Sequence, residues 1–315
     1  MYTLIKRLKN PFYNRDIVSI KDFQRPDLDY LFKVADNLKT NLPNDSLSDK
    51  SIGLMFFEPS TRTRLSFESA MNSLAGKSIS FGDPSSTSTQ KGENLSDSLL
   101  TMDQYVDAII LRHASEGVSR YASEICQSPI INAGSGSEEH PTQAMLDVFT
   151  IMNECGKVDG LNIAIFGDLK YGRTVYSLLY ALSNYKPNIH LVSPKPLQLR
   201  PDPLLELQDR LNITTHDNLQ DIISDLDVIY TTRIQKERFP DLQEYERVKG
   251  SYKIDINLLN QANKNLILLH PMPRSDEIPS EIDHTVFAKY FNQVSYGKLI
   301  RSTLLYLIFT ENSSF

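Results

Sequence analysis

The sequence predicts an α/β protein with two domains, each built on a mostly parallel β-sheet flanked by helices. The chain has 315 residues, enough for two domains of ordinary size. Short apolar runs alternate with longer amphipathic segments along most of it, and this alternation favours parallel strands joined by right-handed crossovers. Hydrophobic residues make up 40% and charged residues 23%, which is typical of a soluble globular protein.

The first half contains a series of short apolar runs that predict strands. Helical patterns are expected between them, and Phe67, Met71 and Leu74 lie at helical spacing in the first of these. The predicted strands are 51–57, 77–81, 107–112 and 129–133, and the predicted helices are 62–75, 92–105 and 117–125.

A long helix, residues 138–156, is predicted to interrupt this rhythm. Pro141 suits the first helical position, where a missing N–H group costs nothing. Gly156 suits a left-handed cap at the other end. The alternation of strands and helices then resumes, with predicted strands at 161–167, 188–193, 212–216, 227–232 and 265–270.

The domain boundary is therefore placed at this helix. The apolar segment 297–310 predicts a final helix that must dock against other parts of the chain, and it is expected to return to the first domain. The predicted first domain is 1–139 with 297–315, and the predicted second domain is 140–296.

Charge and cysteine content exclude several classes of function. The net charge of −6 argues against a general nucleic-acid binder. Cys126 and Cys155 belong to no C-x-x-C pair or Cys/His cluster, so neither a disulfide framework nor a metal site is expected, and no cofactor is predicted. The N-terminus lacks the apolar core of a signal peptide, and no apolar run approaches 18 residues. A cytoplasmic protein that does not enter a membrane is expected.

The stretch "FFEPSTRTRLSFESA", residues 56–70, predicts an anion site. It places two arginines and four hydroxyl residues within positions 60–66, where the first predicted strand gives way to a helix. Helix N-termini present free N–H groups and favour negative charge, and arginine matches phosphate oxygens. The pattern therefore predicts a phosphate seat, although it is not a Walker motif. The alternative is a capped helix with surface arginines.

The string "STRTR" followed by "LSFE" resembles the signature of the carbamoyltransferases, which use it to hold the phosphate of carbamoyl phosphate. The resemblance covers about residues 12 to 309, and the strings together are similar to those of the aspartate carbamoyltransferases. The further strings that carry it are, in order, "QKGENLSDSL" (90–99), "DAIILRHASEG" (107–117), "HPTQAMLD" (140–147), "GDLKYGRTVYSLL" (167–179), "YTTRIQKERF" (230–239) and "LHPMPRSDEI" (269–278).

The resemblance implies a site for carbamoyl phosphate. Arg112 would contact the phosphate and the carbamoyl oxygen, His140 would polarise the carbonyl, and Gln143 would hold the NH2 group. His140 and Gln143 are three residues apart, so one helical turn would place both on the same side. For His113 a packed structural role is as plausible as a direct one. The full implied set is Ser60, Thr61, Arg62, Thr63, Arg112, His140, Gln143 and Pro271.

The resemblance also implies a site for L-aspartate, in which arginines read the carboxylates and a proline turn offers backbone carbonyls to the amino group. In the family the first X-Pro pair of that turn, here His270–Pro271, is typically strained or cis. The implied set is Lys91, Arg173, Arg233, Gln235, Met272 and Pro273. Lys91 would reach into the site of a neighbouring subunit, whereas without the resemblance it would be read as a solvated loop lysine.

The implied reaction is direct transfer of the carbamoyl group to the α-amino group of aspartate, with release of phosphate. It would be the committed step of de novo pyrimidine (UMP) biosynthesis. No motif resembles an activated nucleophile with its base, so catalysis is expected to come from positioning and from oxyanion stabilisation. The implied catalytic residues are Thr63, Arg112, His140 and Lys91.

The resemblance further implies a cyclic homotrimer with active sites at subunit interfaces. Residues 113–121 and 233–245 resemble the family versions that also bind zinc-containing regulatory chains, so such a partner is predicted.

Three alternatives remain. An ornithine carbamoyltransferase typically has "HCLP" and an "SMG" loop, whereas this chain has "HPMP" (270–273) and lacks "SMG". A non-enzymatic relative would be expected to lose the reactive residues, which are all present. A dehydrogenase on the second half is disfavoured because "GDLKYG" (167–172) is not a G-x-G-x-x-G fingerprint.

Overall fold

The computed structural model describes residues 9–41, 43, 45–81, 93–136, 139–234, 243 and 252–311. The chain forms two compact units. Unit 1 comprises Met1–Thr142 and Gly297–Phe315, and unit 2 comprises Gln143–Tyr296. Each unit contains one parallel β-sheet with helices against it, so the predicted fold class is confirmed.

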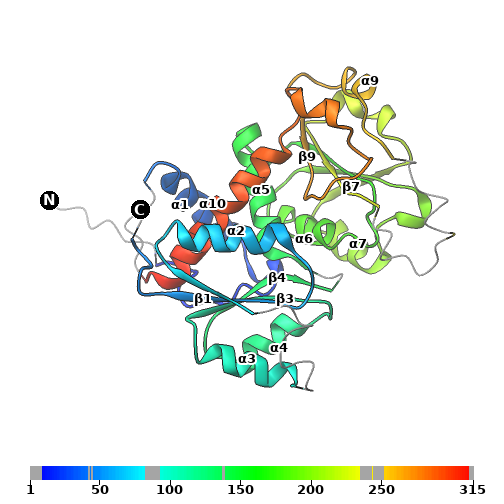
Figure 1. Ribbon diagram of the computed structural model, residues 1–315. Helices are drawn as coiled ribbons and strands as arrows, with labels where there is room; N and C mark the ends of the chain where they lie inside the picture. The colour runs from blue at the N-terminus through cyan, green and yellow to red at the C-terminus, as the bar shows by residue number, and fades with distance from the viewer. Residues whose placement is uncertain are drawn as a thin grey trace. The chain divides into compact units, whose positions relative to one another are not determined.

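Unit 1 is built on a four-stranded parallel sheet in the order β2-β1-β3-β4. Helices α3 and α4 lie on one face and α2 on the other (Figure 1). Met55, Ile109 and Leu111 point towards α3 and α4 in one buried cluster. The elements are η1 (Ile20–Asp22), α1 (Arg25–Leu38), β1 (Ser51–Phe56), α2 (Thr61–Asn72), β2 (Lys77–Ser80), α3 (Leu95–Asp103), β3 (Ala108–His113), α4 (Val118–Ile125) and β4 (Ile130–Ser135).

The C-terminal helix α10 (Tyr290–Phe309) begins seven residues earlier than the predicted start at 297. Its second half is fixed within unit 1 by polar contacts. Arg301 Nη1 donates to Ser66 Oγ of α2 at 2.8 Å, and the Asn10 side chain donates to the Leu307 carbonyl at 2.7 Å. The apolar C-terminal segment is thus buried against residues from the start of the chain and from α2.

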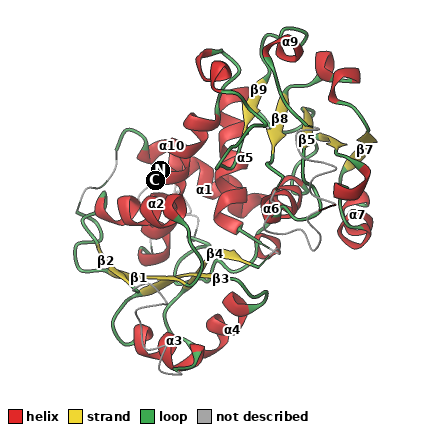
Figure 2. Ribbon diagram, turned by 45° about the vertical axis from the view of Figure 1, so that its right-hand side comes forward, coloured by secondary structure: helices red, strands yellow, loops and turns green. Residues whose placement is uncertain are grey.

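Unit 2 is built on a five-stranded parallel sheet in the order β7-β6-β5-β8-β9 (Figure 2). Alternate residues of β8 face opposite sides: Ile229 joins the cluster beneath α9, whereas Tyr230 reaches α5. The elements are α5 (Pro141–Cys155), β5 (Asn162–Phe166), α6 (Arg173–Leu182), β6 (Asn188–Val192), η4 (Lys195–Leu197), α7 (Pro201–Gln208), β7 (Asn212–His216), η5 (Leu219–Asp221), η6 (Ile223–Asp225), β8 (Val228–Thr231), α9 (Ile256–Leu259), β9 (Ile267–Leu269) and η8 (Ser280–His284).

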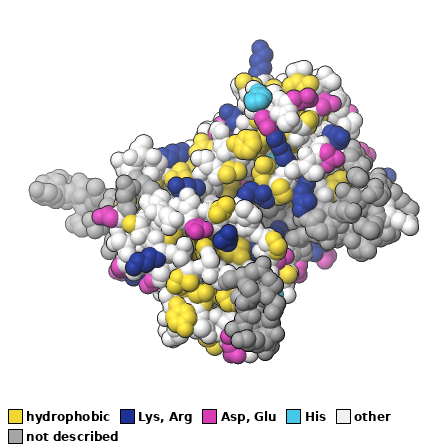
Figure 3. All heavy atoms as spheres, viewed as in Figure 1, with side chains coloured by type: hydrophobic (Ala, Val, Ile, Leu, Met, Phe, Trp, Pro, Cys, Tyr) yellow, Lys and Arg dark blue, Asp and Glu magenta, His cyan; other side chains and the backbone are white. Residues whose placement is uncertain are grey.

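Because both sheets are parallel, the carboxyl ends of their strands meet at one edge in each unit, where ligands bind in open α/β sheets. Basic and acidic side chains are interspersed over the described part of the face seen in Figure 3. Within the described ranges, no helix is long and apolar enough to cross a membrane.

Candidate active site

The predicted phosphate seat lies at the start of α2, directly after β1. Ser60 is the N-cap residue, with an extended backbone, and its side chain makes no capping hydrogen bond. Thr61 and Arg62 are exposed in the first turn. The Ser60 hydroxyl therefore does not serve the helix as a cap, and the first N–H groups of α2 lie at the carboxyl edge of the sheet.

Thr63 and His140 meet in the interior of unit 1. Their side chains are 8% and 4% exposed, and Thr63 Oγ1 lies 3.5 Å from His140 Nε2. His140 precedes Pro141, the first residue of α5. The structure thus brings together two of the predicted site residues that are 77 positions apart in the sequence.

Arg112 lies near the end of β3, beside Phe56 of β1. Its side chain is 12% exposed, Nη1 donates to the Ala133 carbonyl at 3.1 Å, and Nε lies 3.4 Å from Glu58 Oε2. Strand β4 and the connection between β1 and α2 therefore hold the guanidinium, and a positive charge is fixed at the carboxyl edge of the sheet. Glu58, which is not among the predicted site residues, lies two residues after the end of β1.

His113, next to Arg112, behaves as a packed residue. Its Nδ1 accepts the N–H of Ser115 at 2.9 Å, and its ring lies 5.4 Å from that of Phe57. Burial lowers its pKa, and the negative charge of Glu58 offsets this only in part. These contacts favour the structural role left open by the sequence.

In unit 2, Arg173 is the first residue of α6 and is buried, and Arg233 follows β8. The segments that carry them come close together. The Thr232 N–H donates to the Phe166 carbonyl at 2.8 Å, and Gly167 has φ +113°, so an added Cβ there would lie 2.3 Å from the Thr232 carbonyl oxygen. Only glycine permits this approach.

The buried ring of His270 holds the proline turn after β9 by hydrogen bonds. His270 Nδ1 accepts the Met272 N–H at 2.8 Å, so the neutral ring carries its proton on Nε2, which lies 2.8 Å from Glu277 Oε1. Burial lowers the pKa of His270, which agrees with a neutral ring. In this turn the cis peptide bond is Met272–Pro273, where Met272 has φ +59°. The prediction of a cis or strained bond at His270–Pro271 was therefore wrong, since the cis bond lies at the second X-Pro pair of the turn.

Gln143 lies in the first turn of α5, and its NH2 group donates to Asp147 Oδ1 at 2.8 Å. Because α5 begins at Pro141, His140 lies outside the helical turn that was expected to align it with Gln143. Lys91 and Gln235 fall outside the described residues.

Asp147 was not among the predicted site residues, although its spacing of four from Gln143 on a helix was a usable signal. Gln293, whose amide reaches both Asp147 and the backbone of His270, was not predicted either. Nothing in the sequence pattern indicated that residue.

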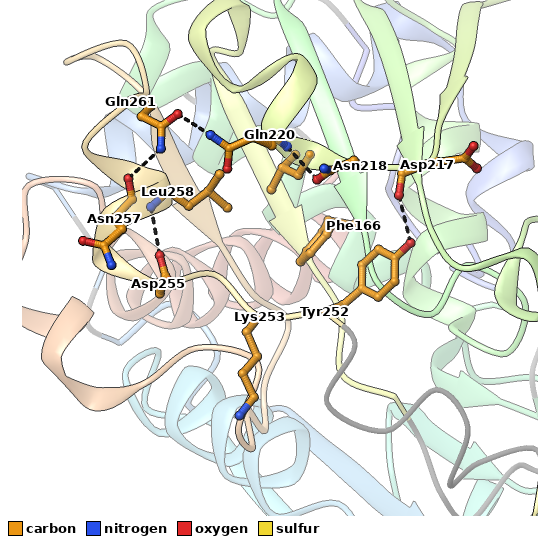
Figure 4. A pocket seen from close by; sticks show the side chains of 11 residues that line it. Phe166, Asp217, Asn218, Gln220, Tyr252, Lys253, Asp255, Asn257, Leu258 and Gln261 are labelled. Atoms are coloured by element: carbon orange, nitrogen blue, oxygen red, sulfur yellow. Dashed lines mark hydrogen bonds between the residues drawn. The ribbon is translucent and has the colours of Figure 1, made fainter.

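A pocket of about 500 Å³ opens at the carboxyl ends of β5 and β7 (Figure 4). Phe166 and Tyr252 form its wall, with ring centroids 4.9 Å apart, and the Tyr252 hydroxyl donates to the Asp217 carbonyl at 3.2 Å. None of the predicted site residues lines it.

Both cysteines are partly buried thiols, and burial followed by nearby carboxylates raises the pKa of each to about 11. Over the described ranges, no group of three or more His, Cys, Asp or Glu residues is arranged to hold a metal ion.

Comparison with known families matches both halves of the chain. Residues 15–153 match the carbamoyl-P binding domain of aspartate/ornithine carbamoyltransferase, and residues 159–308 match the Asp/Orn binding domain. The aspartate carbamoyltransferase catalytic subunit of Nitrosopumilus maritimus is 51% identical over 96% of this chain and 99% of the relative. That of Methanopyrus kandleri is 48% identical over 94% and 98%.

Solved structures of aspartate transcarbamoylases are also similar to this chain. The catalytic subunit of M. jannaschii aspartate transcarbamoylase superposes with a TM-score of 0.86 at 47% identity, covering 93% of this chain and 97% of that one. Aspartate transcarbamoylase from Trypanosoma cruzi in complex with N-(phosphonacetyl)-L-aspartic acid gives 0.89 at 35% identity, covering 98% and 99%. The chain belongs to the aspartate/ornithine carbamoyltransferase family, as a catalytic chain of the aspartate carbamoyltransferase type.

Proposed function

We propose that this chain transfers the carbamoyl group of carbamoyl phosphate to the α-amino group of L-aspartate, giving N-carbamoyl-L-aspartate and phosphate. The observation that carries the proposal is the contact of Thr63 with His140, together with Arg112 held near the carboxyl end of β3, in a chain 51% identical to an aspartate carbamoyltransferase catalytic subunit. Ornithine is disfavoured as the acceptor, because the relatives described above are named for aspartate.

On this proposal unit 1 binds carbamoyl phosphate. The phosphate lies against the first turn of α2, where Ser60, Thr61, Arg62 and Thr63 supply hydroxyls, backbone N–H groups and a guanidinium. Arg112 contacts both the phosphate and the carbamoyl oxygen. The family domain matched over residues 15–153 supports this assignment.

Unit 2 binds aspartate. Arg173 and Arg233 follow adjacent strands, β5 and β8, and suit the two carboxylates. Backbone carbonyls of the turn at Pro271, Met272 and Pro273 accept from the amino group and the carbamoyl NH2. Gln235 and Lys91 are proposed to complete the contacts to aspartate.

The proposed chemistry is direct attack of the aspartate amino group on the carbamoyl carbon. Negative charge develops on the carbamoyl oxygen, and Thr63, Arg112 and His140 stabilise it by donating hydrogen bonds. The C–O bond to phosphate then breaks, phosphate leaves with the bonding electrons, and it takes up the proton that the attacking nitrogen loses. Holding both substrates in reacting geometry supplies the rest of the acceleration.

We further propose a cytoplasmic homotrimer in which Lys91 acts in the site of the neighbouring subunit. A zinc-containing regulatory chain is the proposed additional partner, supported by the resemblance of residues 113–121 and 233–245 to versions that bind one. The product would feed de novo pyrimidine synthesis. Light scattering of the purified protein, and the metal content of any chain that co-purifies, test the assembly.

The activity is tested by incubating the purified protein with carbamoyl phosphate and either L-aspartate or L-ornithine, and measuring the carbamoylated amino acid and phosphate. Aspartate should be carbamoylated at least about 100-fold faster, because an arginine pair rejects a cationic side chain. Phosphate release that requires ornithine, or no carbamoylated product with aspartate, would overturn the proposal.

A further inference from the structure

Asp147 is a buried carboxylate of unit 2 to which the proposed mechanism gives no role. It lies one turn after Gln143 on α5 and is 0% exposed. Three side chains of the described part of the chain donate hydrogen bonds to it. They are the amide of Gln143 to Oδ1 at 2.8 Å, the amide of Gln293 to Oδ1 at 2.6 Å, and the hydroxyl of Tyr230 to Oδ2 at 2.8 Å.

Each of these contacts leads towards a different substrate-binding segment. Gln143 is itself a proposed contact of the carbamoyl group. Gln293 accepts the His270 N–H on Oε1 at 2.9 Å, and the His270 ring accepts the Met272 N–H. Tyr230 lies on β8, three residues before Arg233, and also hydrogen-bonds Thr174 in the first turn of α6. The hydrogen bonds that lead away from Asp147 through Gln143, Gln293 and Tyr230 are called its branches. They end at four segments of the proposed site: the start of α5, the 270–273 turn, the end of β8 and the first turn of α6.

The polarity of this network sets the orientation of the Gln143 amide. A carboxylate only accepts hydrogen bonds, so Gln143 must turn its NH2 towards Asp147. Its oxygen, Oε1, is then the end of the amide left to accept a hydrogen bond. The carbamoyl NH2 group of the substrate is a donor and requires such an acceptor. The orientation of the Gln293 amide is fixed as well, because its NH2 donates to Asp147 and its oxygen accepts the His270 N–H.

We propose that Asp147 is a positioning residue that orients Gln143 to recognise the carbamoyl NH2 group and, through Gln293, fixes the 270–273 turn for aspartate. The inference rests on the proposed function. It adds that the preference for a carbamoyl over an acetyl group originates in a carboxylate that does not touch the substrate.

Acetyl phosphate is the probe for the first branch, because it replaces the carbamoyl NH2 with a methyl group and keeps the carbonyl and the phosphate. Tyr230→Phe is the reference variant, because it keeps the hydrogen bonds that the Gln143 and Gln293 amides donate to Asp147. In the double variant Tyr230→Phe/Asp147→Leu, no carboxylate is left to accept from the Gln143 NH2, and the apolar side chains at positions 147 and 230 need no hydrogen-bond partner. Either end of the Gln143 amide can then face the carbamoyl NH2.

The measurement is the inhibition constant of acetyl phosphate divided by the KM of carbamoyl phosphate. The ratio should fall about tenfold between Tyr230→Phe and the double variant, since the Gln143 oxygen is no longer held in place to accept from the carbamoyl NH2. Glu154→Gln is the matched control. Glu154 also lies on α5 and accepts from Asn292 and Tyr296 of α10, but its contacts lead to no site residue, so its ratio should stay unchanged.

An unchanged ratio, which includes the case in which acetyl phosphate and carbamoyl phosphate both bind equally more weakly, would overturn the first branch. Gln293→Leu tests the second branch and also serves if the double variant does not fold. It should raise the KM of aspartate about tenfold and leave the ratio unchanged, and an unaltered KM would refute that branch. Should the wild-type protein fail to carbamoylate aspartate at all, the proposed function fails first, which separates the two outcomes.

Discussion

Replacing Arg112 with alanine should remove most of the activity and only part of the stability. The side chain is nearly buried, donates to the Ala133 carbonyl at 3.1 Å and lies 3.4 Å from Glu58. Truncation leaves that carbonyl without this donor and Glu58 without this cation. Both functions of the residue, structural and chemical, can therefore be measured in one variant.

The stability loss follows from these contacts. A hydrogen bond from a charged donor contributes about 1.5–3 kcal/mol. The contact with Glu58, a quarter exposed, adds at most about 1 kcal/mol after solvent screening. We expect the unfolding free energy to fall by about 2–3 kcal/mol. For activity, removing a donor to the developing oxyanion costs about 10²- to 10³-fold in kcat.

The assay compares kcat and the KM of carbamoyl phosphate at saturating aspartate, with urea unfolding of the same preparations. Arg112→Lys should recover little activity, because an ammonium lacks the planar fork that reaches two acceptors. Arg120→Ala is the matched control in unit 1. Its guanidinium is 52% exposed and pairs with Asp22 at 3.0 Å, so activity should stay within about twofold.

A folded Arg112→Ala protein with turnover within about tenfold of wild type would refute the assignment of Arg112 to the site. A loss of activity that merely follows the unfolded fraction across a urea or temperature series would show that the residue acts only on the fold.

Two further predictions concern stability. Burial lowers the pKa of His113, His190 and His270, so the unfolded chain binds more protons than the folded chain at mildly acidic pH. The contribution of these histidines to the free energy of unfolding is present above about pH 6.5 and is lost as the pH falls below it. Melting should therefore move to lower temperature between about pH 7.5 and 5.5, less so in His270→Asn, and an equal shift in that variant would contradict the reasoning. Gly167→Ala should destabilise by about 3 kcal/mol or more, through backbone strain and the close carbonyl. Gly160→Ala, with φ +76° but open space around its Cβ, should cost only about 1 kcal/mol; equal unfolding midpoints would refute this.

The sequence by itself predicted the strands of both sheets, because apolar runs bounded by polar segments are local features. Predicted strands 51–57 and 227–232 became Ser51–Phe56 and Val228–Thr231, and Pro141 does begin its helix. Helix α1 was not anticipated, and α10 was expected to start too late, because its first turns are more polar than the segment after residue 297.

The site could be anticipated only as strings of residues, since spacing along the chain does not say which side chains meet. Tertiary structure decided that Thr63 contacts His140, that Glu58 and Ala133 hold Arg112, and that Gly167 passes against Thr232. It also decided that Asp147 gathers donors from β8, α5 and α10. A buried carboxylate must be satisfied by whichever donors the packing of distant elements brings within about 3 Å, and no local pattern encodes that.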